Sequence, residues 1–278
     1  MKKKTLCLLL ALGGLIVAPQ FGQAQLLKRL QKNLEKHIEN KADNVVDNLL
    51  NGKEEEPASE SAKTKAGRSG KPAASTGVYD FVPGREVIFE DNMAKDAPGR
   101  MPSKWKTHST GEVVSVEGAA GKWLRLESNA SYQLAPLLQL PEKFTLEFDI
   151  LTRSAEASDL RDILFGFSKN PTPKHYIYGS SDQTVINTEL QFFYNNVATR
   201  SNDTGVENRV EFPLDNLGNA RIPVAIEVNG THMRVFVNRQ SVLDTEALTL
   251  ESPKYFFVSN DDTRDGAQAY IGNIRIAR

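Results

Sequence analysis

Two stretches of the chain, Lys122-Trp123-Leu124-Arg125-Leu126-Glu127 and Phe144-Thr145-Leu146-Glu147-Phe148-Asp149-Ile150, alternate apolar and polar residues. A period of two is typical of β-strands that bury one face and leave the other in contact with solvent. The pattern predicts that Leu146, Phe148 and Ile150 point into a core. Glu147 and Asp149 then point away from it. Strands of this kind favour a β-sandwich.

Similar strands are predicted along the rest of the chain from Val78 to Arg278. β-Branched and aromatic residues there stand in short runs between turn-forming residues. The Asn229-Gly230 pair predicts a tight hairpin turn between two of these runs. The predicted runs are 85–90, 112–116, 162–168, 188–194, 209–212, 222–229, 232–238, 241–244, 255–259 and 270–277. We therefore expect residues 78–278 to form one all-β domain.

The N-terminal residues 1–24 have the pattern of a secretory signal peptide. Three lysines at 2–4 precede a short apolar run over 6–18, and Gly22-Gln23-Ala24 supplies a small-residue cleavage site. The run is too short to span a bilayer. The only cysteine, Cys7, lies inside this leader, so no disulfide is expected in the mature protein. These features predict an exported protein in the periplasm or associated with the outer membrane.

Residues 25–52 are predicted to form one amphipathic helix, followed by a flexible linker over 53–77. Apolar residues recur every three or four positions, and an eleven-residue frame aligns Leu27, Ile38 and Leu49. The stripe could pack on the protein's own domain, drive self-association or lie at a membrane surface. The linker is rich in Glu, Pro, Ala, Ser and Lys, a composition that cannot bury a core.

Charge argues against nucleic acid as the partner of the predicted β-domain. Residues 78–278 contain 27 acidic and 21 basic residues, which gives a net charge of −6. Nucleic-acid-binding surfaces are basic, because they neutralise phosphates.

Three segments together resemble a known group of exported proteins. These are Tyr79-Asp80-Phe81-Val82-Pro83-Gly84 with the strand Val87–Asp91, the stretch Leu140–Asp149, and the closing Ile271–Ala277. They are similar to Bacteroidota proteins whose concanavalin A-like (laminin-G-like) jelly-roll sandwich often precedes a peptidoglycan-binding domain of the outer-membrane-protein-A type. The resemblance implies a concanavalin A-like sandwich in the cell envelope, with the first and last strands paired. It transfers no catalytic residues.

Glu147-Phe148-Asp149 is the one stretch that suggests catalysis. Laminarinase-type hydrolases of this fold carry a further carboxylate two or three residues later, because retaining hydrolysis needs a nucleophile and an acid. Leu151 and Thr152 occupy those positions here. We therefore expect a protein that is not an enzyme. A degenerate laminarinase-like hydrolase and a purely structural envelope protein remain the alternatives.

The candidate binding surface consists of residues whose side chains are predicted to point away from the core. Aromatic rings beside charged groups suit sugar rings or extended peptides, so a glycan or an envelope protein is the expected partner. Strand parity places the following residues on such faces: Trp123, Arg125, Glu127, Glu147, Asp149, Gln191, Phe193, His232 and Arg234.

No cofactor is expected, although one loop is rich in oxygen ligands. Asn260, Asp261, Asp262 and Asp265 could begin a calcium site, but Arg264 opposes a cation and no EF-hand spacing is present. An ordinary Asp-rich turn is the simpler interpretation. Four scattered histidines and no mature cysteine give no zinc-ligand spacing.

Overall fold

The computed structural model describes residues 79–138 and 140–278. The predicted signal peptide (1–24), amphipathic helix (25–52) and linker (53–77), and with them the predicted self-association, lie outside the described residues. None of the described helices is long and apolar enough to cross a bilayer.

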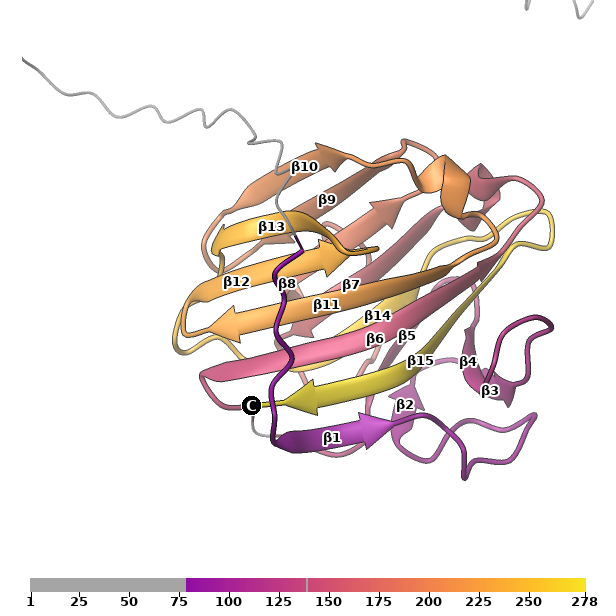
Figure 1. The fold of residues 1–278 in the computed structure, drawn as a ribbon, viewed down its shortest axis with the longest axis horizontal. Coiled ribbons are helices and arrows are strands. Elements are labelled where there is room, and N and C mark those ends of the chain that lie inside the picture. The colour runs from indigo at the N-terminus through magenta and orange to yellow at the C-terminus, as the bar shows by residue number, and fades with distance from the viewer. Residues whose placement is uncertain (1–78, 139) are drawn as a thin grey trace, which may run out of the picture. The chain divides into compact units, whose positions relative to one another are not determined.

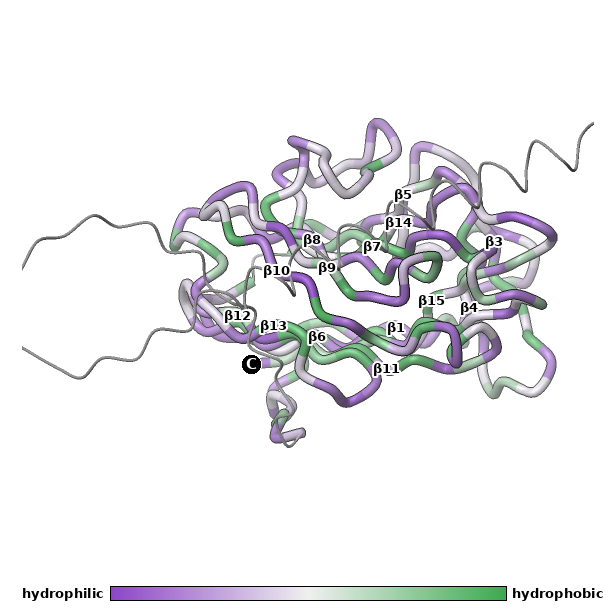
Figure 2. Tube along the Cα trace, turned by 90° about the horizontal axis from the view of Figure 1, so that it is seen from above, coloured by the Kyte–Doolittle hydropathy of each residue, from purple (hydrophilic) through white to green (hydrophobic). Residues whose placement is uncertain are grey.

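Two antiparallel sheets stack face to face in this structure (Figures 1 and 2). The first, sheet A, has the order β13-β12-β11-β6-β15-β4-β3, with β1 also paired to β15. Its strands are β1 (Val87–Asp91), β3 (Gly111–Val114), β4 (Trp123–Leu126), β6 (Lys143–Arg153), β11 (Arg221–Asn229), β12 (His232–Val237), β13 (Gln240–Glu246) and β15 (Gln268–Ala277).

The second sheet, sheet B, has the order β10-β9-β8-β7-β14-β5-β2. Its strands are β2 (Trp105–Thr107), β5 (Ala130–Leu134), β7 (Asp162–Ser168), β8 (Thr184–Gln191), β9 (Asn196–Ser201), β10 (Glu207–Glu211) and β14 (Tyr255–Asn260). Two short 3-10 helices, η1 (Ala157–Leu160) and η2 (Leu214–Leu217), lie in connections between strands. The predicted all-β sandwich is confirmed.

Strand β6 lies in the middle of sheet A, and its inward side chains pack against sheet B. Leu146, Phe148 and Ile150 are buried as their alternation predicts. The Phe148 ring meets Phe165 of β7 and Phe256 of β14, both with ring centroids 5.2 Å apart. Such aromatic contacts across the sandwich add stabilisation beyond the area that they bury.

The predicted pairing of the first and last strands is also confirmed. Phe89 of β1 lies opposite Ile276 of β15, and Asp91 lies opposite Ile274. The hairpin between β11 and β12 turns at Gly230, whose φ of 65° is a left-handed conformation that glycine adopts without strain.

Three strands were not predicted from the sequence. β2 has only three residues, β5 is buried at every position, and β9 mixes small, polar and charged residues. None of them offers a clear alternation. β8 was predicted over 188–194, but it runs from Thr184 to Gln191 and a turn follows.

Phe148→Ala is expected to lower the free energy of unfolding by about 3–5 kcal/mol, because it removes a ring buried between the sheets. Glu147→Gln, one residue away on the outer face, should cost less than about 1 kcal/mol. Denaturant unfolding of both variants measures this difference. A larger loss in Glu147→Gln would show that the assignment of faces is wrong.

Candidate functional site

Most of the predicted binding residues share one surface, the outer face of sheet A. Trp123 and Arg125 lie on β4, Glu147 and Asp149 on β6, and His232 and Arg234 on β12, with Glu127 just after β4. Gln191, at the end of β8 in sheet B, and Phe193, in the turn that follows β8, lie elsewhere. This division could not be predicted from the sequence, because it depends on strand order.

Trp123 faces outward as predicted, but it is not available to a ligand. It is only 1% exposed and packs with Leu151 and Tyr270 in a small cluster on the outer side of the sheet. A Cβ on Gly272 would lie 2.9 Å from the indole ring, so the neighbouring strand is in close contact with it. The interpretation of Trp123 as an exposed stacking platform is wrong, because the chain around 114–119 covers it.

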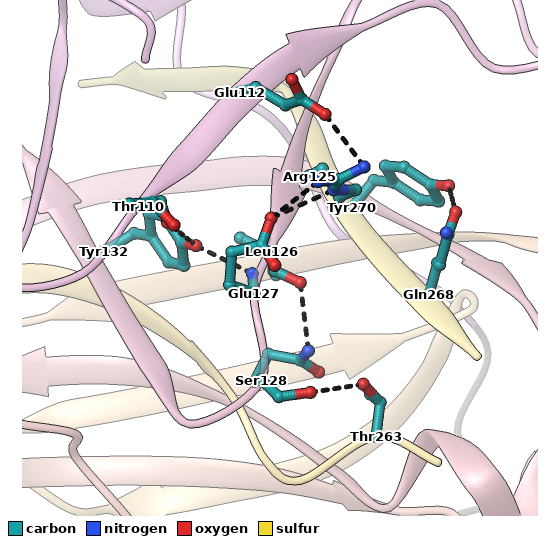
Figure 3. Close-up of polar contacts among 11 residues, drawn as sticks. Thr110, Glu112, Arg125, Leu126, Glu127, Ser128, Tyr132, Thr263, Gln268 and Tyr270 are labelled. Atoms are coloured by element: carbon teal, nitrogen blue, oxygen red, sulfur yellow. Dashed lines mark hydrogen bonds and ion pairs between the residues drawn. The ribbon is translucent and has the colours of Figure 1, made fainter. Parts of the chain in front are cut away.

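Arg125 and Glu127 are engaged with each other and with a neighbouring strand (Figure 3). Arg125 lies 2.9 Å from Glu112 and 3.0 Å from Glu127, measured between guanidinium nitrogen and carboxylate oxygen. The Glu127 backbone N–H donates to the Tyr132 hydroxyl, which in turn donates to the Thr110 carbonyl (Figure 3). Burial raises the pKa of Tyr132 to about 12. This group ties the β4 end of the sheet together.

Glu147 and Asp149 lie instead in an open hollow of about 410 Å³ on the outer face of sheet A, which we call the Glu147 hollow. Polar groups from strands β6, β11 and β15, from the end of β1 and the residue after it, and from the turn between β12 and β13 surround it. The side chains that supply them are Glu90, Asp91, Asn92, Glu147, Asp149, Arg221, Arg239, Asn273 and Arg275.

Hydrogen bonds fix the acidic groups of the hollow in place. Asp149 is 5% exposed and accepts from Arg221 at 2.7 Å and from Asn273 Nδ2 at 2.8 Å. Arg275 donates to Glu147 at 3.0 Å. Asn273 reaches Asp149 because a bulge in β15 inserts it between Gly272 and Arg275, and its φ of 54° is typical of such a position.

One side of the hollow is aromatic. Tyr79 is 41% exposed, and its ring meets the edge of Phe236 at 5.4 Å between centroids. Ala225 lies between Glu147 and Phe236 in the strand register. Because its side chain is only a methyl group, the surface between these two larger side chains is depressed. Partial burial and the nearby Glu147 charge raise the pKa of Tyr79.

Arg234 holds this aromatic side in position. The chain from Tyr79 to Gly84 crosses the outer face of sheet A (Figure 1), and Arg234 forms an ion pair with Asp80. Arg234 also lies 3.2 Å from Glu227 and above the Phe236 ring, while His232 lies 3.0 Å from Asp244. Arg234 therefore positions the crossing segment, whereas His232 pairs with the neighbouring strand β13; Phe236 below Arg234 is buried.

Most residues of the hollow were missed in the sequence, among them Tyr79, Arg221, Asn273 and Arg275. The pairing of β6 with β11 and β15 brings the last three beside Asp149 and Glu147, and the segment that crosses sheet A adds Tyr79. The Asn273 bulge leaves no recognisable signal in the sequence.

The predicted parity around Gln191 fails after that residue. β8 ends at Gln191, and 192–195 form the turn to β9. Phe193 and Tyr194 are both exposed at its tip, with ring centroids 5.1 Å apart, although they were predicted on opposite faces. Gln191 is 8% exposed and lies on the outer face of sheet B.

The oxygen-rich loop does not gather its ligands. The Asn260 amide is turned inward and donates to the Leu126 carbonyl, whereas Asp261 accepts from the Tyr176 hydroxyl. Asp262 and Asp265 are exposed. Within residues 79–138 and 140–278, no group of three or more His, Cys, Asp or Glu side chains is placed to hold a metal ion.

Comparison with known proteins supports the fold. No protein-family model matches the chain, and no curated protein matches it. The carbohydrate recognition domain of Emp47p has a TM-score of 0.52 at 13% identity, over 68% of this chain and 94% of that one. At this identity the likeness shows a shared fold, so the described domain is a concanavalin A-like β-sandwich.

Two further solved structures are more distantly similar. The Ca2+-bound exoplasmic/lumenal domain of VIP36 has a TM-score of 0.48 at 12% identity, over 67% of this chain and 88% of that one. The carbohydrate-binding module CBM66 from Bacillus subtilis has a TM-score of 0.42 at 14% identity, over 63% and 96%.

Trp123→Ala is expected to lower the free energy of unfolding by about 3–5 kcal/mol, since it empties a buried cluster. Thermal and denaturant unfolding will measure this. A variant as stable as the parent chain would contradict the covered position of the indole ring.

Asp162, opposite Gln191 in sheet B, predicts a pH dependence of stability. Burial raises its pKa from 3.8 to about 6, with repulsion from Glu189 and Asp261 acting in the same direction. The folded state thus holds this proton more tightly than the unfolded chain. The resulting stability is present below about pH 4 and is lost as the pH rises towards 6. Asp162→Asn should weaken this decline, as measured by unfolding between pH 4 and 7. An unchanged decline would contradict the assignment.

Proposed function

We propose that this protein is a non-catalytic, exported cell-envelope module that binds glycan through the Glu147 hollow. The observation that carries the proposal is the composition of that hollow. Fixed carboxylates, guanidinium groups and an amide surround an open space beside the half-exposed Tyr79 ring. Its volume of about 410 Å³ falls within the range of small-molecule sites.

Sugar hydroxyls both donate and accept, so they need acceptors and donors close together. Asp149 and Glu147 supply acceptors, and Arg221 supplies donors on the same side of the sheet. These groups are already oriented by their own hydrogen bonds, which lowers the cost of ordering them on binding. A sugar ring can place its apolar face against Tyr79. The fold shared with a carbohydrate recognition domain supports this proposal.

An enzymatic function is the second candidate, because Glu147 and Asp149 share one hollow. Each accepts a hydrogen bond from an arginine. Leu151, where a laminarinase-type enzyme has a further carboxylate, is 1% exposed beneath Trp123 and Tyr270. We therefore infer binding without turnover.

The location and origin of the protein are part of the proposal. The lysine-rich start and apolar run of residues 1–24 support export, to the periplasm or the outer membrane. The resemblance of the segments at 79–91, 140–149 and 271–277 to Bacteroidota envelope proteins supports that source. An envelope protein that displays a polar strand is the other partner that the hollow could accept.

Arg221→Ala is expected to weaken glycan binding by about 1–3 kcal/mol, since it leaves Asp149 without its cationic partner. A glycan array that includes β-glucans and peptidoglycan fragments would identify the ligand for the full chain. Isothermal titration would then compare variants.

Arg125→Ala is the matched control, because it removes the same charge on the same face outside the hollow. Equal losses in both variants would place the site elsewhere on sheet A. New reducing ends that disappear in Glu147→Gln would refute the binding-only function.

A further inference from the structure

A second hollow lies on the outer face of sheet B, on the opposite side of the sandwich from the Glu147 hollow. It has a volume of about 450 Å³ and is formed by β8, β9, β10 and the segment around Gly179. We call it the Gln191 hollow. Its principal side chains are those of Tyr178, Glu189, Gln191, Ala198, Arg200 and Arg209.

The strand register explains why this surface is hollow. Ala198 on β9 lies opposite Glu189 on β8 and opposite Arg209 on β10. A methyl group therefore forms the floor between two long charged side chains. Arg200 is occupied by Glu207 at 3.2 Å, whereas Arg209 has no ion pair among the residues that the structure describes.

The side-chain amide of Gln191, at the edge of this floor, has one polar atom without a hydrogen-bond partner among the described residues. Its Nε2 donates to Glu189 Oε2 at 2.8 Å, which fixes the orientation of the amide. Its Oε1 is buried and accepts no hydrogen bond within the described part of the chain. A buried acceptor left in this state destabilises the fold, so such atoms need an explanation.

Glu189 is the second acceptor of the hollow. Burial raises the pKa of its carboxyl group, whereas Gln191, Arg200 and Arg209 act to lower it. The loop is in close contact with this carboxylate, because a Cβ on Gly179 would lie 1.9 Å from Oε1. Glycine at this position lets the backbone cover one side of Glu189 while the side towards Ala198 lies open.

We propose that the Gln191 hollow is a second saccharide-binding site, which takes a ring with two neighbouring hydroxyl groups. One hydroxyl would donate to Glu189, and the neighbouring hydroxyl would donate to Gln191 Oε1 after a turn of the Gln191 side chain brings this buried atom to the surface of the hollow. Arg209 would donate to a ring or hydroxyl oxygen, and the apolar face of the ring would lie against Tyr178, which is 52% exposed. A ligand with donors alone would leave Arg209 without a partner. This inference extends the proposed function.

Two sites on opposite faces would let one module bridge two glycan strands. When one hollow binds a glycan strand, neighbouring glycan strands are at a high effective concentration around the hollow on the other face. The protein would therefore cross-link a polymer rather than coat it.

The experiment uses the full chain with two defined probes, laminarihexaose and the peptidoglycan disaccharide of N-acetylglucosamine and N-acetylmuramic acid. NMR titration would follow the Gln191 side-chain amide and the backbone amides of β8, β9 and β10. We expect at least one probe to shift these signals, and Ala198→Leu, which fills the floor, to weaken this response by about tenfold or more. The variant should leave any shifts on β6, β11 and β15 unchanged.

The outcomes separate the two proposals. Shifts around the Glu147 hollow alone would overturn the second site and leave the proposed function standing. Shifts around Gln191 alone would support the second site and contradict the Glu147 hollow as a binding site. No shift at either hollow would overturn both, and an Ala198→Leu variant that still responds at Gln191 would overturn the second site.

Discussion

One constraint determines which residues of sheet A point outward: alternate side chains of β6 are buried between the two sheets. Phe148 lies against Phe165 and Phe256, and this contact fixes which face of the strand is inside. Because successive side chains point to opposite faces, Glu147 and Asp149 must then point out. β6 is the central partner of both β11 and β15, so its parity sets the outward residues of its neighbours as well.

A side chain that points away from the core is not always accessible to a ligand, as two residues of β6 on the outer face of sheet A show. Asp149 and Leu151 both point away from the core, yet Asp149 lines an open hollow and Leu151 lies beneath Trp123. The difference comes from the chain that passes in front of each. The segment near 114–119 covers the β4 end, whereas the Tyr79–Gly84 crossing leaves a gap that Ala225 deepens.

The sequence was sufficient for the architecture and for part of the surface. Alternation identified β6 and its faces, because that pattern is local and follows from burial on one side. It failed for β5, which is buried at all positions, and for the end of β8, where a turn replaced the expected strand. Arg221, Asn273 and Arg275 could not be grouped with Asp149, since their proximity depends on strand order and on a bulge. Trp123 was misjudged because no strand pattern shows which loop covers an outward side chain.

A crystal structure of the full chain with a bound oligosaccharide tests the central claim most directly. The account predicts a sugar ring in the Glu147 hollow, with its apolar face on Tyr79 and its hydroxyls within hydrogen-bonding distance of Asp149 or Glu147. An empty Glu147 hollow with the ring bound elsewhere, at the Gln191 hollow alone or on the exposed Phe193 and Tyr194 turn, would contradict it.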